Sequence, residues 1–441
     1  MPFRHADRPD HSYYLISVDK NGVERRDDPD APHGELSTVV SDQLRNEPYT
    51  DVFLLSHGWK GAVPDAVEQC DKWIGAMASA TGDVEAIRRE RPGFNPLLVG
   101  FHWPSLSFGD ESFAGVAFAT PDGDGGIDQM IEEYAGYLAD TPAARAALRT
   151  IIESAGDDVS PASLPAEVVT AYQTLDRESG LGAAGPGGTP ADDREPFDPE
   201  AAYQATVEDA DVSFANPVTG AVIGLLQVLS FWKMKDRARL VGEVGVHGLL
   251  AKFQAAAAGR DVRFHLMGHS FGCIVQSAAT AGPVGRYGLR QPVDSLTLLQ
   301  GALSFWSYCS DIPHARGKAG YFRSIVADKR VSGAIVTSQS EHDTAVGRLY
   351  PLAAGARRDV VFDETELPKY GALGTFGVRG PGCDTTDLDM HDTATAYGLE
   401  RGKIYNINSD RYISHKVGAS GAHSDIANKE VAHAMWAAVR L

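Results

Sequence analysis

The feature that constrains this chain most is a set of short apolar runs separated by turn residues. Seven runs of seven or eight residues are rich in Val, Ile, Leu and Phe, and most are followed by Gly, Ser or Asp. They lie at 12–18, 51–57, 96–103, 261–267, 293–300, 331–338 and 402–408. This pattern is typical of strands that are buried on both faces of a parallel sheet.

Helical patterns accompany these runs. Apolar residues recur at helical spacing within 62–80, 240–258 and 426–439, and Ser424 or Asp425 stands where the last of these helices needs its N-cap. Strands that alternate with helices of this length build a doubly wound sheet. The sequence therefore predicts an α/β fold with a mostly parallel sheet.

The alternation is interrupted once, between residues 106 and 235. That stretch contains Gly/Asp turns, a Pro/Gly-rich segment and helical pieces, and it is longer than an ordinary loop. We therefore predict a core made of residues 1–105 and 236–441, with a large, mainly helical insertion at 106–235. We expect the insertion to act as a cap or lid over an active site.

The insertion contains the longest apolar stretch of the chain, Ala221 to Trp232. Its 12 residues are too few to cross a bilayer as a helix, so we expect a buried or pocket-lining segment rather than a lipid contact. The residues predicted to line a substrate pocket are Trp103 from the core and Leu225, Leu226 and Phe231 from the insertion.

Composition narrows the partners and the compartment. The 40 basic and 59 acidic residues give a net charge of −19, which argues against nucleic acid or an anionic membrane as the main partner. The four cysteines are far apart and form no zinc-spaced cluster, so we predict no metal and no cofactor. The N-terminus shows no apolar signal core, and we expect a cytoplasmic protein with a small-molecule substrate. The oligomeric state is left open.

The motif that carries chemistry is a G-x-S-x-G at 268–272, directly after the apolar run 261–267. A small-residue helical pattern follows it, which gives the strand–turn–helix context of a nucleophile elbow. Ser270 is the predicted nucleophile, and Gly268 and Gly272 leave room for strand and helix to approach each other. The backbone N–H of Phe271 is a predicted oxyanion donor at the helix N-terminus.

A second oxyanion donor is expected from the loop that follows an earlier strand. The run 51–57 ends in His57, Gly58 and Trp59. Gly58 allows the chain to turn close to a substrate, and the N–H of Gly58 or of Trp59 is the predicted donor. A strand-end turn with a core tryptophan is the alternative interpretation of the same three residues.

The segments FLLSHGW, GFHWPS and LMGHSFG together resemble the α/β-hydrolase superfamily, and most closely a bacterial branch of largely uncharacterised hydrolases. The resemblance covers about 51–105 and 239–441, and it does not cover the insertion. It implies an eight-stranded, mostly parallel sheet and a Ser, acid, His triad in that chain order. It carries little information on the substrate.

The resemblance implies an acid after a strand downstream of the elbow. Asp343 follows the run 331–338 through a Ser-rich turn and precedes a small apolar helical pattern, as in the family. Asp311 and Asp410 are rivals, and Glu341 is a close neighbour. A solvated loop carboxylate is the alternative interpretation of Asp343.

The base is expected after the last strand. His423 lies in a Gly-rich loop just before the C-terminal helical pattern, whereas His433 falls inside that pattern and His415 before the loop. His269 adjoins the serine, and in the family the residue there packs or joins a polar network rather than acting as the base. We therefore predict the triad Ser270, Asp343 and His423.

These residues predict a serine hydrolase that cleaves carboxylic esters through an acyl-enzyme. An amidase or peptidase with the same triad is one alternative, and a non-catalytic protein that keeps the fold is another. The presence of every triad candidate argues against the latter.

Overall fold

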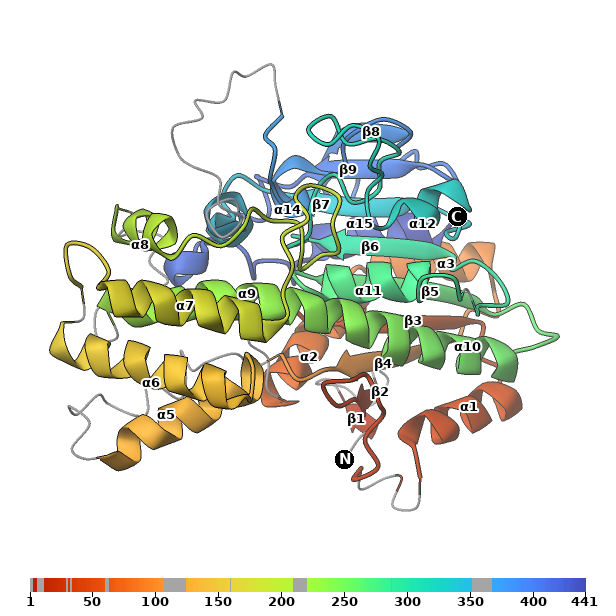
Figure 1. The fold of residues 1–441 in the computed structure, drawn as a ribbon. Coiled ribbons are helices and arrows are strands. Elements are labelled where there is room, and N and C mark those ends of the chain that lie inside the picture. Colours follow the sequence, from red (N-terminus) through yellow and green to blue (C-terminus); the bar gives the residue numbers. More distant parts are fainter. Residues whose placement is uncertain are drawn as a thin grey trace. The chain divides into compact units, whose positions relative to one another are not determined.

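The computed structural model describes residues 3–5, 12–28, 31, 34–59, 63–105, 124–158, 160–208, 220–286, 288–350 and 367–441 (Figure 1). The chain forms two compact units. The first comprises residues 1–105, 237–347 and 371–441, and the second comprises 106–236 and 348–370. The sequence predicts 348–370 as part of the core, and the structure places these residues in the second unit instead.

The first unit is built on one nine-stranded sheet with the order β1-β2-β4-β3-β5-β6-β7-β9-β8. Every neighbouring pair is parallel except β1 and β2. The strands are β1 (Phe3–His5), β2 (Ser12–Ser17), β3 (Asp51–Ser56), β4 (Pro96–His102), β5 (Arg263–His269), β6 (Ser295–Leu299), β7 (Ile335–Gln339), β8 (Thr385–Asp389) and β9 (Ile404–Asn408). The α/β class and all seven predicted strands are confirmed.

The two strands that the sequence pattern missed, β1 and β8, are the edges of the sheet. β8 has the sequence TTDLD and is nowhere fully buried, because it pairs with β9 on one side only. An edge strand needs no continuous apolar run, so it lacks the signal by which the other strands were found.

Helices cover both faces of this sheet (Figure 1). One face carries α1 (Leu36–Asn46), α10 (His247–Ala256) and α11 (Gly272–Ala281). The other face carries α2 (Val63–Ser79), α3 (Thr81–Glu90) and α15 (Lys429–Val439), which form an apolar core with the strands. Within that core the indole N–H of Trp436 donates to the carbonyl oxygen of Met77 at 3.0 Å. Shorter helical turns in this unit are α12 (Arg323–Ala327), α14 (Leu373–Phe376) and η3 (Gly418–Ser420).

The three predicted helices are present, with two differences in detail. The pattern at 240–258 is the end of a longer helical run, made of α9 (Gly220–Val241), the π-helical turn η1 (Gly242–Val246) and α10. The N-cap of α15 is Asn428, whose side chain accepts from the N–H of Val431 at 2.9 Å. The predicted cap Asp425 instead accepts from the N–H groups of Ser414 and His415.

The described part of the second unit is mainly helical. Its helices are α5 (Asp124–Tyr137), α6 (Pro142–Asp157), α7 (Ala166–Ser179), α8 (Pro199–Glu208) and the part of α9 up to residue 236. They share an apolar core that includes Leu148, Tyr172 and Leu226. Thr141 caps α6 by accepting from the N–H of Ala144, and Pro142 follows it at the first helical position. The role of this unit as a cap stays a prediction.

Polar contacts explain why residues near 350 and 370 belong to the second unit. The Tyr350 hydroxyl donates to Asp193 at 3.0 Å and accepts from the buried Lys235 ammonium at 2.8 Å. Burial lowers the pKa of Lys235 to about 7. Lys369 and Tyr370 both bond to Glu195. These partners are far apart in sequence, so no local sequence pattern predicts the contacts between them.

A membrane-spanning helix is not found in the part of the chain that the structure describes, where every helix is too short or too polar to cross a bilayer.

Stability is expected to depend on pH through His433, which bonds to the Asp83 carboxylate at 2.7 Å. That carboxylate raises the pKa of His433, so this contribution is complete below the unfolded value of about 6.5 and is lost as pH rises through the folded pKa. We expect His433→Gln to reduce the free energy of unfolding more at pH 5.5 than at pH 9. Urea unfolding of both proteins measures this, and equal losses at the two pH values would contradict it.

Candidate active site

Ser270 lies at a sharp turn between β5 and α11, with a φ of +55°. Among the described non-glycine residues only Gln300 and Lys329 share a positive φ, and such a conformation is strained for an L-residue. The turn is hydrogen-bonded to the end of β6, because the Ser270 N–H donates to the Leu299 carbonyl at 3.0 Å. A strained serine between a strand and a helix N-terminus is the geometry of a nucleophile elbow.

The two elbow glycines are required by close packing. A Cβ on Gly268 would lie 2.3 Å from the carbonyl oxygen of Gly272, and a Cβ on Gly272 would lie 2.2 Å from that of Ser56. Both contacts involve backbone and are too short for any side chain. The start of α11 is therefore pressed against β5 and against the end of β3.

Asp343 and His423 are in direct contact. The Nδ1 of His423 lies 2.7 Å from Oδ2 of Asp343, whose side chain is fully buried. The other carboxylate oxygen of Asp343 accepts from the N–H of Val346 at 3.2 Å. A carboxylate at Nδ1 fixes the orientation of an imidazole and leaves Nε2 for chemistry, as in a hydrolase triad.

The loops that carry the acid and the base are joined through their backbones. Asp343 and Gly421 form an antiparallel bridge, and the Ala422 N–H donates to the His342 carbonyl at 2.9 Å. Gly421 has a φ of +62°, and a Cβ there would lie 2.1 Å from Oγ1 of Thr344. Contact between the two loops thus depends on the absence of a side chain at 421.

His269 connects the elbow to the base. Its ring lies 4.7 Å from the ring of His423, and its Nε2 lies 2.8 Å from the His423 carbonyl oxygen. Its Nδ1 lies 2.8 Å from the Gln69 amide nitrogen on α2. Burial holds the pKa of His269 well below the usual range, so the ring is neutral.

The loop after β3 reaches the serine. A Cβ on Gly58 would lie 2.7 Å from the Ser270 Cβ and 3.2 Å from its Oγ, so only glycine fits beside this hydroxyl. The ring of Trp59 stacks on that of Phe271, with centroids 5.5 Å apart. Phe271 is the N-cap residue of α11. The structure thus brings all three predicted oxyanion residues next to Ser270.

Buried histidines fix the orientation of the Gly58 peptide. Nδ1 of His57 lies 2.9 Å from the Gly58 carbonyl oxygen and donates to it, while Nε2 accepts from the Trp103 N–H at 3.3 Å. His102 donates to the same Nε2 through its Nδ1 at 3.0 Å. Burial lowers the pKa of His57 to about 3 and that of His102 to about 4, so both rings stay neutral.

The same hydrogen bond also constrains the direction of a predicted donor N–H. A trans peptide is planar, so a carbonyl held toward the His57 ring turns the N–H of the next residue the opposite way. That residue is Trp59. Sequence reasoning missed His57, His102 and Gln69, because an imidazole or amide that orients backbone has no motif of its own.

The rival triad residues lie elsewhere. Asp311 pairs with Arg316 at 3.0 Å and accepts from the Gly317 N–H, and Asp410 accepts from the N–H of Glu341. His433 bonds to Asp83, and His415 is exposed. Within the described part of the chain, Asp343 is the one of these acids that bonds to His423.

The residues predicted to line a pocket are all buried. Trp103 lies at the end of β4 in the first unit, and its indole N–H donates to the His57 carbonyl at 3.2 Å. Leu225 and Leu226 lie in the apolar core of the second unit, and Phe231 packs against Tyr350 there. Their role in substrate binding stays a prediction.

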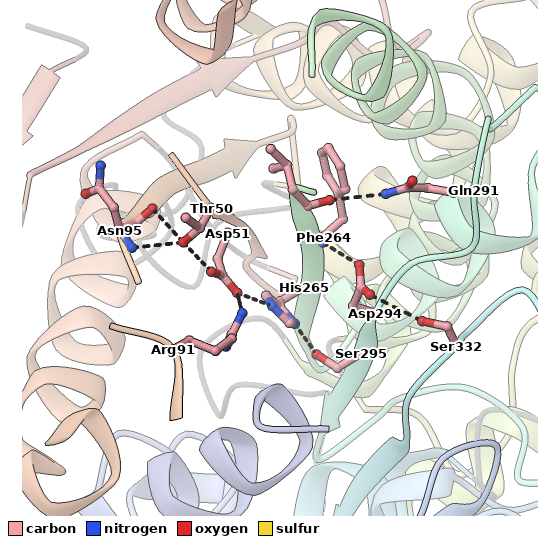
Figure 2. A network of polar contacts seen from close by, with 11 residues as sticks. Thr50, Asp51, Arg91, Asn95, Phe264, His265, Gln291, Asp294, Ser295 and Ser332 are labelled. Carbon is pink, nitrogen blue, oxygen red and sulfur yellow. Dashed lines mark hydrogen bonds and ion pairs between the residues drawn. The ribbon is translucent and has the colours of Figure 1, made fainter. Parts of the chain in front are cut away.

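A second Ser, His, Asp set belongs to a network of polar contacts that includes Asp51, His265 and Ser295 (Figure 2). His265 bonds to Asp51 through Nε2 at 3.0 Å and to Ser295 through Nδ1 at 2.9 Å. Asp51 also pairs with Arg91 and accepts from Thr50. Asp51 and Ser295 are the first residues of β3 and β6, so this set lies at the amino ends of the strands.

The two sets differ in what nucleophilic catalysis requires. Ser295 continues along a strand with an ordinary φ, whereas Ser270 lies in a strained turn directly before the N-cap of a helix. Parallel α/β sheets bind ligands at the carboxyl ends of their strands, where Ser270, Asp343 and His423 stand. The Ser295 set is therefore a buried structural network.

Comparison with known proteins gives no match to any family model, any curated protein or any solved structure. Within the described residues there is also no group of His, Cys, Asp and Glu side chains that could hold a metal ion. The function of the site is therefore argued from its own geometry.

Gly421→Ala tests the contact between the acid and base loops. Because the new Cβ would meet Thr344, we expect it to displace His423 and to lower kcat about 100-fold, the usual effect of a misplacement near 1 Å. Gly418→Ala is the matched control, since Gly418 has a similar φ of +56° and open space at its Cβ. Equal kcat values in the two variants, measured with an activated ester, would contradict this account.

Proposed function

We propose that this protein is a serine hydrolase of the α/β-hydrolase type that cleaves carboxylic esters. The observation that carries the proposal is the buried Asp343 carboxylate on Nδ1 of His423, in the same unit as a strained serine elbow. A neutral imidazole can accept a proton near neutral pH, which is what a general base must do.

The order of the strands supports the same proposal. Ser270 follows β5, Asp343 follows β7 and His423 follows β9, which gives the chain order Ser, Asp, His. These strands lie in the order β5-β6-β7-β9, so the three loops open at one edge of the sheet. That chain order on a parallel sheet is characteristic of α/β-hydrolases.

The mechanism follows from the roles of these residues. His423 takes the proton of Ser270 as the hydroxyl attacks the acyl carbon, and Asp343 stabilises the imidazolium that forms. The alcohol leaves with the proton from His423, and an acyl-enzyme remains on Ser270. His423 then removes a proton from water as the water oxygen attacks the acyl carbon. The bond between that carbon and Ser270 Oγ breaks, Oγ takes the proton back from His423, and the carboxylic acid is released.

Stabilisation of the oxyanion falls to backbone N–H groups. The Phe271 amide stands at the N-terminus of α11, where the helix dipole favours negative charge. The Trp59 amide belongs to the peptide that His57 holds. Removing one such donor typically costs about 100- to 1,000-fold in kcat.

Two other functions were considered for the same residues. An amidase would use the same triad, with His423 giving its proton to a leaving amine, which is a poorer leaving group than an alcohol. A non-catalytic protein would have no use for a strained serine beside a glycine that must stay bare. We therefore propose ester cleavage, the reaction that makes the smaller chemical demand on this triad.

Fluorophosphonate labelling tests the nucleophile. We expect wild type to label and Ser270→Ala to lose both labelling and hydrolysis of p-nitrophenyl acetate and butyrate, by at least about 1,000-fold. Ser295→Ala is the matched control, because it removes the serine of the other Ser, His, Asp set, and it should label like wild type.

Two results would overturn the proposal. Folded wild type that does not label has no competent nucleophile, and labelling that survives in Ser270→Ala places the nucleophile elsewhere. Comparison of acetate, butyrate and octanoate esters then measures how long an acyl chain the site accepts.

A further inference from the structure

We propose that Gln69 and His269 form a positioning pair for the base His423. Gln69 donates a hydrogen bond to His269, and His269 donates one to the main-chain carbonyl of His423. The inference rests on the proposed function, because it assigns these two residues a part in that reaction. Neither residue touches a reacting atom in this scheme, and both act through His423.

The pair links three parts of the first unit. Gln69 lies on α2, His269 is the last residue of β5, and His423 lies in the loop between β9 and α15. The distances along this chain of contacts are 2.8 Å from Gln69 Nε2 to His269 Nδ1 and 2.8 Å from His269 Nε2 to the His423 oxygen. The elbow and the base are thus tied together one residue from Ser270.

The direction of both bonds follows from the groups involved. A backbone carbonyl only accepts, so His269 must carry its proton on Nε2. Its Nδ1 is then a lone pair, and the Gln69 amide must donate to it through its NH₂ group. The His423 carbonyl therefore sets the tautomer of His269, and the Gln69 amide stabilises that tautomer by donating to Nδ1.

The same contacts explain why His269 is not the base, although it adjoins the serine. Both of its ring nitrogens are occupied, one by the His423 carbonyl and one by Gln69. Its ring is also packed edge-on against Trp73, with centroids 6.3 Å apart. No lone pair is left to accept the proton of Ser270.

A neutral neighbour suits the chemistry. His423 becomes positively charged when it takes the proton, and the His269 ring lies 4.7 Å away. A charged ring at that distance would oppose the imidazolium. Burial lowers the pKa of His269, which keeps the ring neutral through the range in which His423 works.

Kinetics of two His269 variants test the pair. His269→Phe keeps the ring and its packing but removes both hydrogen bonds, whereas His269→Gln places an amide donor near the former Nε2. We expect the Phe variant to lose about 100-fold in kcat with KM changed less than about threefold, and the Gln variant to recover at least about tenfold of that loss. A Phe variant with wild-type kcat, or a Gln variant no better than Phe, would overturn the proposal.

Two variants of the partly exposed Gln69 provide a second measurement, which does not require the variants at position 269 to fold. Gln69→Met removes the donor and should lower kcat at least about tenfold. Gln69→Glu presents a group that only accepts when ionised, so His269 should acquire a proton on Nδ1. Imidazole ¹⁵N NMR should show His269 as the neutral Nε2–H form in wild type and as Nδ1-protonated in Gln69→Glu. A wild-type Nδ1–H tautomer, or unchanged kcat in Gln69→Met, contradicts the inference.

Failure of the proposed function gives a different result. Wild type that does not react with a fluorophosphonate would remove the reaction itself, whatever the NMR spectra show. Wild type that labels at Ser270, with His269→Phe as active as wild type, would remove only the positioning role.

Discussion

The candidate site depends on how closely the backbone packs where β5 ends and α11 begins. No side chain fits at Gly268, Gly272 or Gly58, and these positions let β3, β5 and α11 approach one another. That approach places the loop after β3 against Ser270 and stacks Trp59 on Phe271. The strained φ of Ser270 is a consequence of the same turn, and its hydrogen bond to Leu299 holds it there.

Next to this backbone, two neutral histidines hold main-chain carbonyl groups in place by hydrogen bonds. His57 holds the Gly58 peptide and His269 holds the His423 carbonyl, and burial keeps both rings uncharged. Asp343 is the buried anion that contacts His423. In the proposed reaction, positive charge on His423 would meet one carboxylate and no competing cation among these partners, which is the preorganisation that electrostatic catalysis requires.

Much of the fold could be predicted from the sequence, because strands buried on both faces leave continuous apolar runs. β1 and β8 could not, because an edge strand pairs on one side only and TTDLD has no such run. The cap of α15 was assigned to Ser424 or Asp425, and the structure gives it to Asn428, since a helix start shifts easily by a few residues. The assignment of 348–370 failed for a different reason: Tyr350 and Tyr370 reach partners near 193–195, and sequence alone does not show such distant contacts.

For the site, the sequence predicts the proposed triad but not the residues that contact it. The elbow has a local signature, and Asp343 and His423 were found through their places after strands. Gln69, His57, His102 and Gly421 act through contacts between segments far apart in the chain, so their parts appear only when the loops are seen together.

The central claim is that Ser270 carries a covalent acyl group during turnover. The most direct measurement mixes the protein with p-nitrophenyl acetate, quenches it in acid within the first turnovers and maps the acetyl mass by peptide mass spectrometry. This account predicts one acetyl group on the peptide that contains Ser270, and its absence in Ser270→Ala. An acetyl group on another residue, or hydrolysis with no acylated peptide at any quench time and no burst of p-nitrophenol, would contradict it.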